Sequence, residues 1–305
     1  MNLSATLRFG LAAALLLSAS SLSAFDFGKL VPDAKDLGKL APDNKALQLV
    51  GRSVESVAKA NEDLTPLQQH YLGRSFGATI LQNRKPLEND AANRYVNELG
   101  QALVLAGDQP PTYAGYHFLI VDSPEANAFS GPGGYILVTR GLVKMTTNEA
   151  ELAAVLAHEI AHVALEHGVK AIQKDRLTGA WVGIGADAAK TLGPDEVKEM
   201  TAAFEGSVSD LTKAVVDKGY SRETEFEADA RAVTVLRRAG FSPRALLGML
   251  QELRAVPQGA GSSLSKTHPS PQDRIDKVKT LVGSDGQVTV SPAQVSRYQA
   301  ALGGL

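Results

Sequence analysis

The chain has 305 residues, a formal net charge of -2 and no cysteine. This charge excludes the strongly basic surface typical of nucleic-acid-binding proteins, so we expect no nucleic acid among the partners. The lack of cysteine excludes disulfides, lipid attachment at a cysteine and thiolate metal ligands. Any bound metal must therefore be held by histidine and carboxylate side chains.

Residues 1–24 have the pattern of a secretory signal peptide. Arg8 precedes an apolar stretch that is too short to span a bilayer, and small residues follow as far as Ala24. We expect cleavage near Ala24. No later segment reaches the length of a membrane-spanning helix, so we expect no transmembrane helix in the mature chain.

Residues 25–60 form a distinct N-terminal arm that contains a short repeat. The segment 28–35 recurs as 38–45, and both copies contain glycine and proline. This composition favours an extended or loosely turned arm over a packed element. The arm is either a linker or a docking segment, and the residues favour neither.

A single domain is expected over residues 61–282, and it begins with two helices followed by two strands. Their periodicities predict helices over 67–81 and 90–105 and strands over 116–121 and 135–139. The segment Gly131-Pro132-Gly133-Gly134 requires a turn between the strands. His117 is interpreted as a strand residue and not as a metal ligand.

The next predicted helix ends near Gly168 and is almost entirely apolar. Two capping boxes mark its start, Thr146 with Glu149 and Asn148 with Glu151, and Gly168 can end it. The apolar residues place this helix in the core. Histidine and glutamate side chains without a ligand would be costly there, which favours a metal site over chance.

The motif His158-Glu159-Ile160-Ala161-His162 lies on this helix. The two histidines are four residues apart, so they share one face and can bind the same Zn²⁺ at about 2.0–2.1 Å. Glu159 lies one step around the helix and can take a proton from a water that zinc activates. This arrangement is typical of zinc hydrolases.

Residues 172–220 connect this helix to the next candidate element. Within them, the segment 178–187 is apolar and rich in glycine, and it contains the one tryptophan of the chain. It is too short and too interrupted to span a membrane. It fits a lid over the active site and a core helix equally well.

Zinc needs a third protein ligand. The longer motif H-E-x-x-H-x-x-G-x-x-H does not fit, because Gly168 occupies its last position and His167 comes one residue too early. The alternative is a glutamate from a second helix. That helix is expected over residues 221–240.

On the helix 221–240, Glu225 and Asp229 share a face. Glu225 can ligate zinc, while Asp229 can accept a hydrogen bond from the back of a zinc histidine and fix its tautomer. Glu223 and Glu227 are assigned to a solvated face. A wholly solvated acidic helix is the alternative reading, and the upstream histidine motif argues against it.

Four motifs together resemble the M48 metallopeptidases, the gluzincins related to the CAAX prenyl protease and HtpX, in their soluble bacterial envelope form. The resemblance extends from about residue 61 to residue 275. It implies an α+β fold, mostly helical and zincin-like, with a small sheet and with zinc between two central helices. The motifs lie at residues 127–134, 158–162, 221–229 and 267–275.

The resemblance assigns zinc binding to His158, His162 and Glu225, the general base to Glu159, and the position behind His158 to Asp229. One Zn²⁺ per chain is therefore expected.

The resemblance also places two later residues, His268 and Arg274, at the active site. Either could stabilise an oxyanion, and His268 could instead occupy the open zinc position and hold the enzyme latent. Asn127, Ala128 and Phe129 would begin a sheet-edge strand to which a substrate chain adds by backbone hydrogen bonds.

These inferences predict a periplasmic zinc endopeptidase that acts on unfolded or misassembled envelope proteins, with peripheral association at the outer membrane. Residues 283–305 are expected to form a short C-terminal tail. Two other functions stay open. One is a latent zinc-bearing chaperone or assembly factor, and the other is a zinc hydrolase with a non-peptide substrate.

Overall fold

The computed structural model describes residues 64–172, 209, 211–255, 267–268 and 271–305. All of them belong to one compact unit, Glu62–Leu305. The expected signal peptide, the arm 25–60 and the segment 178–187 lie outside the described residues.

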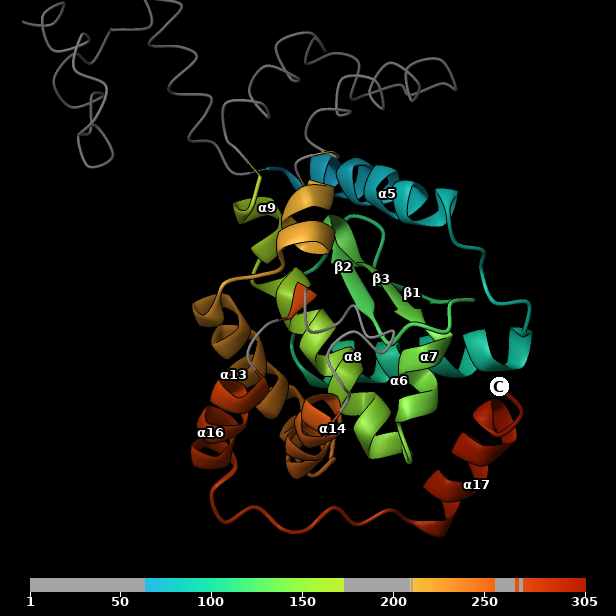
Figure 1. The fold of residues 1–305 in the computed structure, drawn as a ribbon, viewed down its shortest axis with the longest axis vertical. Helices are drawn as coiled ribbons and strands as arrows, with labels where there is room; N and C mark the ends of the chain where they lie inside the picture. Colours follow the sequence, from blue (N-terminus) through green and yellow to red (C-terminus); the bar gives the residue numbers. More distant parts are fainter. Residues whose placement is uncertain (1–63, 173–208, 210, 256–266, 269–270) are drawn as a thin grey trace, which may run out of the picture. The chain divides into compact units, whose positions relative to one another are not determined.

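The described residues form a mostly helical unit around a small sheet (Figure 1). The elements are α5 (Pro66–Gln82), α6 (Asp90–Ala106), β1 (His117–Val121), β2 (Ala128–Gly131), η2 (Pro132–Gly134), β3 (Tyr135–Thr139), α7 (Arg140–Met145), α8 (Glu149–Ala164), α9 (His167–Lys170), η4 (Lys213–Lys218), α13 (Arg222–Arg238), α14 (Arg244–Ala255), α16 (Pro271–Val282) and α17 (Pro292–Leu302).

The two helices predicted before the sheet are confirmed, because local signals fix both starts. Thr65 and Gln68 form a reciprocal capping box at α5, and Asn89 accepts a hydrogen bond from the Ala92 N–H at α6. The buried side chains of α6 follow a helical period and face the sheet and α8. The fold class expected from the sequence is therefore present from its first elements.

Within the described part of the chain, the sheet has three strands in the order β1-β3-β2. β3 pairs in parallel with β1 and antiparallel with β2, so β2 is an edge strand. The turn between β2 and β3 requires glycine at Gly134, whose φ is 99° and where a Cβ atom would lie 2.6 Å from the Gly115 carbonyl oxygen. The edge strand expected from residue 127 onward is thus present over Ala128–Gly131.

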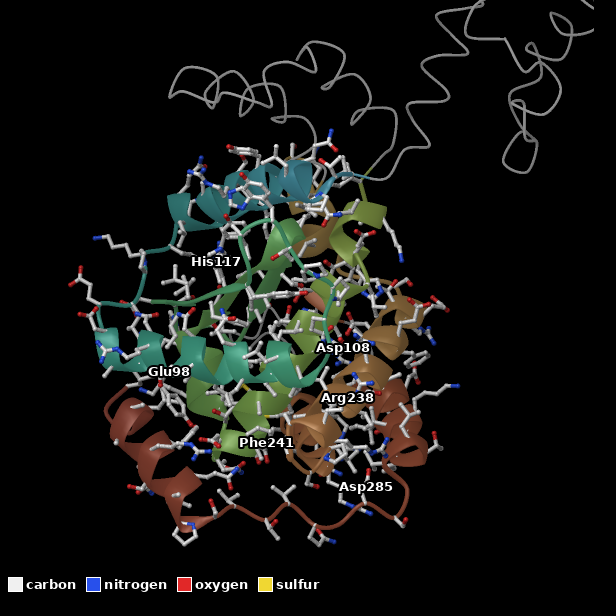
Figure 2. The ribbon with its side chains drawn as sticks, turned by 180° about the vertical axis from the view of Figure 1, so that it is seen from behind. Glu98, Asp108, His117, Arg238, Phe241 and Asp285 are labelled. Carbon is white, nitrogen blue, oxygen red and sulfur yellow. The ribbon has the colours of Figure 1, made fainter. Side chains whose placement is uncertain are left out.

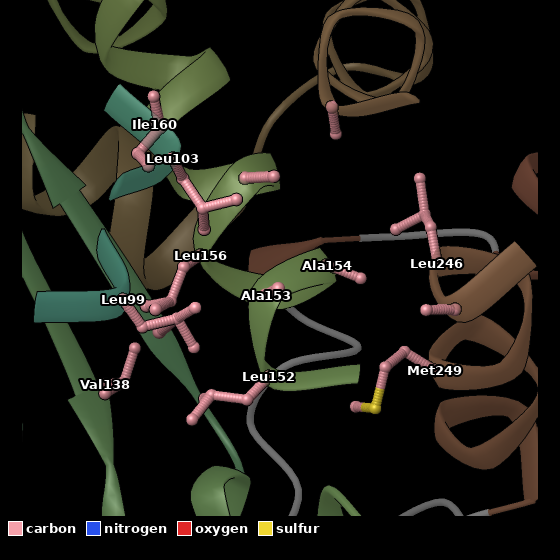
Figure 3. Close-up of a cluster of buried hydrophobic side chains, with 14 of the residues drawn as sticks. Leu99, Leu103, Val138, Leu152, Ala153, Ala154, Leu156, Ile160, Leu246 and Met249 are labelled. Atoms are coloured by element: carbon pink, nitrogen blue, oxygen red, sulfur yellow. The ribbon is translucent and has the colours of Figure 1, made fainter. Parts of the chain in front are cut away.

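Helix α8 runs through the centre of the unit, between the sheet and α13 (Figure 1). In Figure 3, Leu152, Leu156 and Ile160 lie near Leu99 and Leu103 of α6, whereas the small residues of α8 face α14. Asn148 caps the helix by accepting from the Glu151 N–H. Alanine on the α14 side lets the two helices approach closely.

The predicted end of α8 at Gly168 is wrong. The helix ends at Ala164, because Glu166 adopts a left-handed conformation with φ 56° and reverses the chain. The Glu166 carboxylate accepts a hydrogen bond from Gln69 Nε2 at 2.6 Å, which holds the turn against α5. His167 then begins the short helix α9.

Helix α13 packs along α8, and α16 packs on α13 and α14. Ser221 caps α13, and Gly240 lies just beyond its end in a left-handed conformation. Figure 2 shows Arg238 of α13 beside Asp108, which follows α6; their charged atoms are 3.8 Å apart. Among the described residues, no helix is long and apolar enough to cross a membrane.

Candidate metal centre

Helix α8 presents three buried polar side chains on neighbouring positions. His158, Glu159 and His162 are 5%, 2% and 1% exposed. Helical spacing brings the Nε2 atoms of the two histidines to 3.0 Å. Oxygen Oε2 of Glu159 has no hydrogen-bond partner among the described residues. A buried carboxylate oxygen of this kind is explained by a water or substrate that binds beside it.

Helix α13 brings Glu225 to the same point. Its Oε2 lies 3.4 Å from His158 Nε2, and its Oε1 lies 3.4 Å from His162 Nε2. Burial opposes ionisation of Glu225. The neighbouring His268 and Arg274, together with the two α8 histidines, outweigh burial and hold the pKa of Glu225 well below its usual range. The site therefore contains a carboxylate anion.

His268 joins the cluster from the segment that precedes α16. Its Nδ1 lies 3.0 Å from Glu225 Oε1 and 3.3 Å from His158 Nε2, while its Nε2 lies 3.7 Å from Glu159 Oε1. The side chain is 3% exposed. Thr267, the residue before it, donates from Oγ1 to Asn127 Oδ1 at 3.0 Å. The segment thus connects the cluster to the start of the edge strand.

The ligand atoms of these four residues suit a tetrahedral zinc ion. Atoms of His158, His162, Glu225 and His268 all lie within 4.8 Å of one another. Four of their separations, His158–His162, His162–Glu225, His158–His268 and Glu225–His268, are 3.0–3.4 Å, close to the edge of about 3.3–3.4 Å of a tetrahedron with zinc bonds of about 2.0–2.1 Å. Three imidazoles and one carboxylate are ligands that zinc prefers. The residues present therefore fit the metal that the sequence predicted.

Asp229 and Arg274 form a buried pair behind His158. Asp229 Oδ1 lies 3.0 Å from His158 Nδ1. Arg274 donates to both Asp229 oxygens, at 2.8 and 2.7 Å, and its third nitrogen lies 2.8 Å from Glu225 Oε2. Burial opposes ionisation of Asp229, but the Arg274 guanidinium outweighs it and lowers the Asp229 pKa to about 2. In this conformation the guanidinium is therefore engaged by two carboxylates.

Two residues that the sequence interpretation left out also contact the cluster. His167 Nδ1 lies 2.9 Å from His162 Nδ1, and the Tyr220 ring stacks on the His162 ring with centroids 4.2 Å apart. Burial lowers the pKa of His167, although Glu227 opposes this shift. The sequence drew attention to His167 only as a possible third ligand, at a spacing that does not fit. Nothing in the sequence singles out Tyr220.

The expected substrate strand lies beside α8, and its side chains are buried. Asn127, Ala128 and Phe129 are 1%, 0% and 1% exposed. Phe129 packs with Leu72 and Phe76 of α5 in a second hydrophobic cluster. Of these three residues, only the backbone is suited to meet a substrate chain. Asn127 Oδ1 accepts from the Ala128 N–H, which holds the start of the strand.

An apolar pocket opens next to the cluster. Its polar wall contains His158, Glu159, His268 and Arg274. The rest of its lining comes from α7, α8 and α14, through Leu142, Val155, Leu246, Met249, Leu250 and Leu253. A group held at Glu159 can therefore place an apolar side chain in this pocket.

The mostly helical fold and the histidine–glutamate cluster define a metallopeptidase of the zincin type. The chain belongs to peptidase family M48, whose family model matches residues 90–282. This range contains the three motif positions of the cluster, His158, His162 and Glu225, as well as His268. Members of this family use zinc.

The chain is similar to several named proteases. It is 30% identical over 198 residues to the beta-barrel assembly-enhancing protease of Escherichia coli, covering 64% of this chain and 40% of that relative. It is 28% identical over 204 residues to the metalloprotease LoiP of Escherichia coli, covering 66% and 74%. It is 30% identical over 160 residues to the mitochondrial metalloendopeptidase OMA1 of Arabidopsis thaliana, covering 52% and 30%.

Proposed function

We propose that this protein is a zinc endopeptidase that hydrolyses unfolded or misassembled proteins of the bacterial envelope. The observation that carries the proposal is the buried cluster of four ligand atoms beside a glutamate oxygen that has no partner in the described structure. Family membership supports the peptidase activity. Similarity to a protease named for assembly of beta-barrels supports the choice of envelope substrates.

The residues of the cluster divide the chemistry between them. Zinc held by His158, His162 and Glu225 would polarise the scissile carbonyl and lower the pKa of the attacking water. Glu159 takes the proton from this water through the oxygen that has no partner among the described residues, and returns it to the leaving amine. Asp229 accepts from the back of His158 and keeps the opposite ring nitrogen free to bind metal.

The surroundings of the cluster support an extended, apolar substrate. The backbone of β2, at the sheet edge beside α8, can pair with a peptide of almost any sequence. The apolar pocket beside Glu159 can take a side chain of that peptide. Folded proteins bury their apolar side chains, whereas unfolded ones expose them in extended segments. This difference favours unfolded proteins as substrates.

His268 is proposed as the fourth zinc ligand of a resting enzyme. In that position it fills the site that the attacking water must occupy, so hydrolysis requires His268 to move away. The same contact favours a second candidate function, a latent zinc-bearing chaperone or assembly factor that cleaves little. Parallel assays of casein digestion and of aggregation suppression separate the two functions.

The proposed location is the periplasm, reached through the signal peptide at residues 1–24, with peripheral association at the outer membrane. Processing predicts a mature protein that begins near residue 25. Mass spectrometry of the secreted protein measures this terminus. Fractionation of the producing cells shows whether the protein is released in soluble form or with the outer membrane.

The proposed activity is tested by Glu159→Gln. This variant should keep its zinc and its fold and should lose casein hydrolysis by about 10²–10⁴-fold, because the amide has the same shape and cannot take a proton. Zinc content and circular dichroism are measured on the same preparation. Unchanged hydrolysis in a zinc-loaded variant contradicts the role of Glu159. A wild-type protein without zinc or hydrolysis contradicts the proposed function.

A further inference from the structure

A histidine outside the ligand set lies directly behind one of the zinc histidines. His167 is 4% exposed, and its Nδ1 is 2.9 Å from Nδ1 of His162. The other nitrogen of His162, Nε2, faces the ligand cluster. The two rings meet edge to face, with centroids 5.0 Å apart. His167 thus contacts the side of His162 that faces away from the metal position.

The contact continues to a carboxylate on α13. His167 Nε2 lies 3.2 Å from Glu227 Oε2. The Glu227 side chain is 63% exposed, so its other surface faces water. Glu227 therefore differs from Glu225 and Asp229 of the same helix, which are both buried. A line of three groups connects solvent to the back of a zinc ligand: Glu227, His167 and His162.

The proton positions along this line follow from the zinc site. With zinc bound at Nε2, His162 would carry its proton on Nδ1 and donate it to His167 Nδ1. His167 then carries its own proton on Nε2 and donates it to Glu227. In this arrangement each histidine donates one hydrogen bond, His162 to His167 and His167 to Glu227. Both hydrogen bonds are therefore donated in the direction away from the metal position.

The backbone is bent at the residue before His167. Glu166 has φ 56°, a left-handed conformation that is strained for a residue other than glycine. Helix α8 ends at Ala164, and the turn at Glu166 changes the direction of the chain before His167. This turn brings the ring of His167 into contact with the ring of His162. The strained backbone at Glu166 is thus what places His167 against His162.

We propose that His167 is a positioning residue that, with Glu227, fixes the tautomer and orientation of His162 for zinc binding. The inference rests on the proposed zinc site and goes beyond its ligand set. Asp229 contacts His158 directly, whereas Glu227 reaches His162 through an imidazole. Helix α13 therefore supplies a zinc ligand and supports both histidines of α8.

The test measures the dissociation constant for zinc by competition with a chromophoric chelator. His167→Leu removes the acceptor and should weaken zinc binding by about 10–100-fold, the usual effect of losing a hydrogen-bond partner behind a ligand. His167→Asn keeps an acceptor oxygen near the position of Nδ1 and should restore most of the affinity. His117→Leu, a histidine on an exposed position of β1, is the matched control and should bind zinc like wild type.

A second variant isolates the carboxylate. Glu227→Leu should weaken zinc binding by about tenfold, at the low end of that range. It should add little to His167→Leu in the double variant, because the two residues act in one line. If His167→Leu fails to fold, which thermal unfolding of the metal-free protein reveals, His167→Asn and Glu227→Leu still test the inference. Their cobalt-loaded absorption spectra report ligand geometry.

The outcomes separate this inference from the zinc site itself. A wild-type protein that binds no zinc contradicts the proposed function. A wild-type protein that binds one equivalent, with His167→Leu within twofold of its affinity, overturns only the role of His167. Equal losses in His167→Leu and His167→Asn also overturn it, because packing alone would explain them. Wild-type affinity in Glu227→Leu overturns the extension to Glu227.

Discussion

Glu225, Glu227 and Asp229 lie two residues apart on α13, but their surroundings differ. Glu225 and Asp229 are fully buried and contact the histidines of α8, whereas Glu227 is exposed on one side and contacts His167. Partner and burial, not residue type, therefore decide what each carboxylate does. The interpretation of Glu227 as a solvated side chain was incomplete for this reason.

The first prediction compares the two buried carboxylates. Glu225→Ala should lose most of the zinc, because it removes the one carboxylate of the ligand cluster. Asp229→Asn should be milder, with about 10–100-fold weaker zinc binding, because it alters only the support of His158. Metal analysis after dialysis against a chelator measures both. Full zinc retention in Glu225→Ala would remove Glu225 from the ligand set.

The second prediction concerns pH. Burial and the charge of Arg274 oppose protonation of His158, but hydrogen bonds to Asp229 and Glu225 outweigh them and raise its pKa to about 9. Below that pH, zinc must displace a proton from the metal-free site. The apparent zinc affinity should therefore fall by about tenfold for each pH unit below about 9. Chelator competition between about pH 6 and pH 9 measures the slope, and a flat profile contradicts the prediction.

The segment before α16 contacts both the edge strand and the candidate metal position. Thr267 is tied to Asn127 at the edge strand, and His268 lies among the ligand atoms, so one short segment covers both the metal position and the start of the substrate strand. Under the proposed function, a peptide that pairs with β2 would meet this segment where Thr267 contacts Asn127. Displacing the segment would open the metal for hydrolysis.

The third prediction follows from this arrangement. His268→Ala should cleave unfolded casein faster than wild type, because the fourth ligand position is then always open to water. If His268 instead stabilises the oxyanion, cleavage should slow by about 10²–10³-fold. Initial rates at matched zinc content separate the two roles. A rate within about twofold of wild type, far below that scale, rejects both roles.

The helices of the site were predictable because each has a local start signal. Asn148 and Ser221 cap α8 and α13, and the four-residue spacing of His158 and His162 requires only a helix. The end of α8 was not predictable, because the left-handed Glu166 is held by Gln69 of α5. That contact depends on tertiary structure, and Gly168 offered a plausible local alternative.

The C-terminal helix α17 packs against the start of α8, far from it in the sequence. Arg297 donates from two nitrogens to Glu149, which is 1% exposed and also accepts from Tyr95 at 2.8 Å. Tyr298 donates to the Thr146 carbonyl at 2.6 Å. Residues expected as a short tail thus pack on α6 and α8. Sequence patterns could not predict this, because the partners are about half the chain apart.

The fourth prediction measures this support. Arg297→Ala should lower the free energy of unfolding by about 1.5–3 kcal/mol, the usual value of a hydrogen bond to a charged group, because buried Glu149 loses its cation. Arg254→Ala removes an exposed contact with Gln272 and serves as the control, with a change of about 0.5 kcal/mol or less. Urea unfolding of the metal-free proteins gives both values. Equal stability of the two variants contradicts the prediction.

Two buried side chains of α8 have partners that come much later in the sequence, and this affects how the protein folds. Glu149 pairs with a residue 148 positions later, and His158 meets His268 110 positions later. Before these later residues pack on it, α8 has a carboxylate without its cation and histidines without their partners, which disfavours its burial. The four candidate ligand atoms come together only when α13 and His268 have packed against α8. A zinc protease of the proposed kind would therefore gain its metal late, when little of its own chain is still unfolded and open to cleavage.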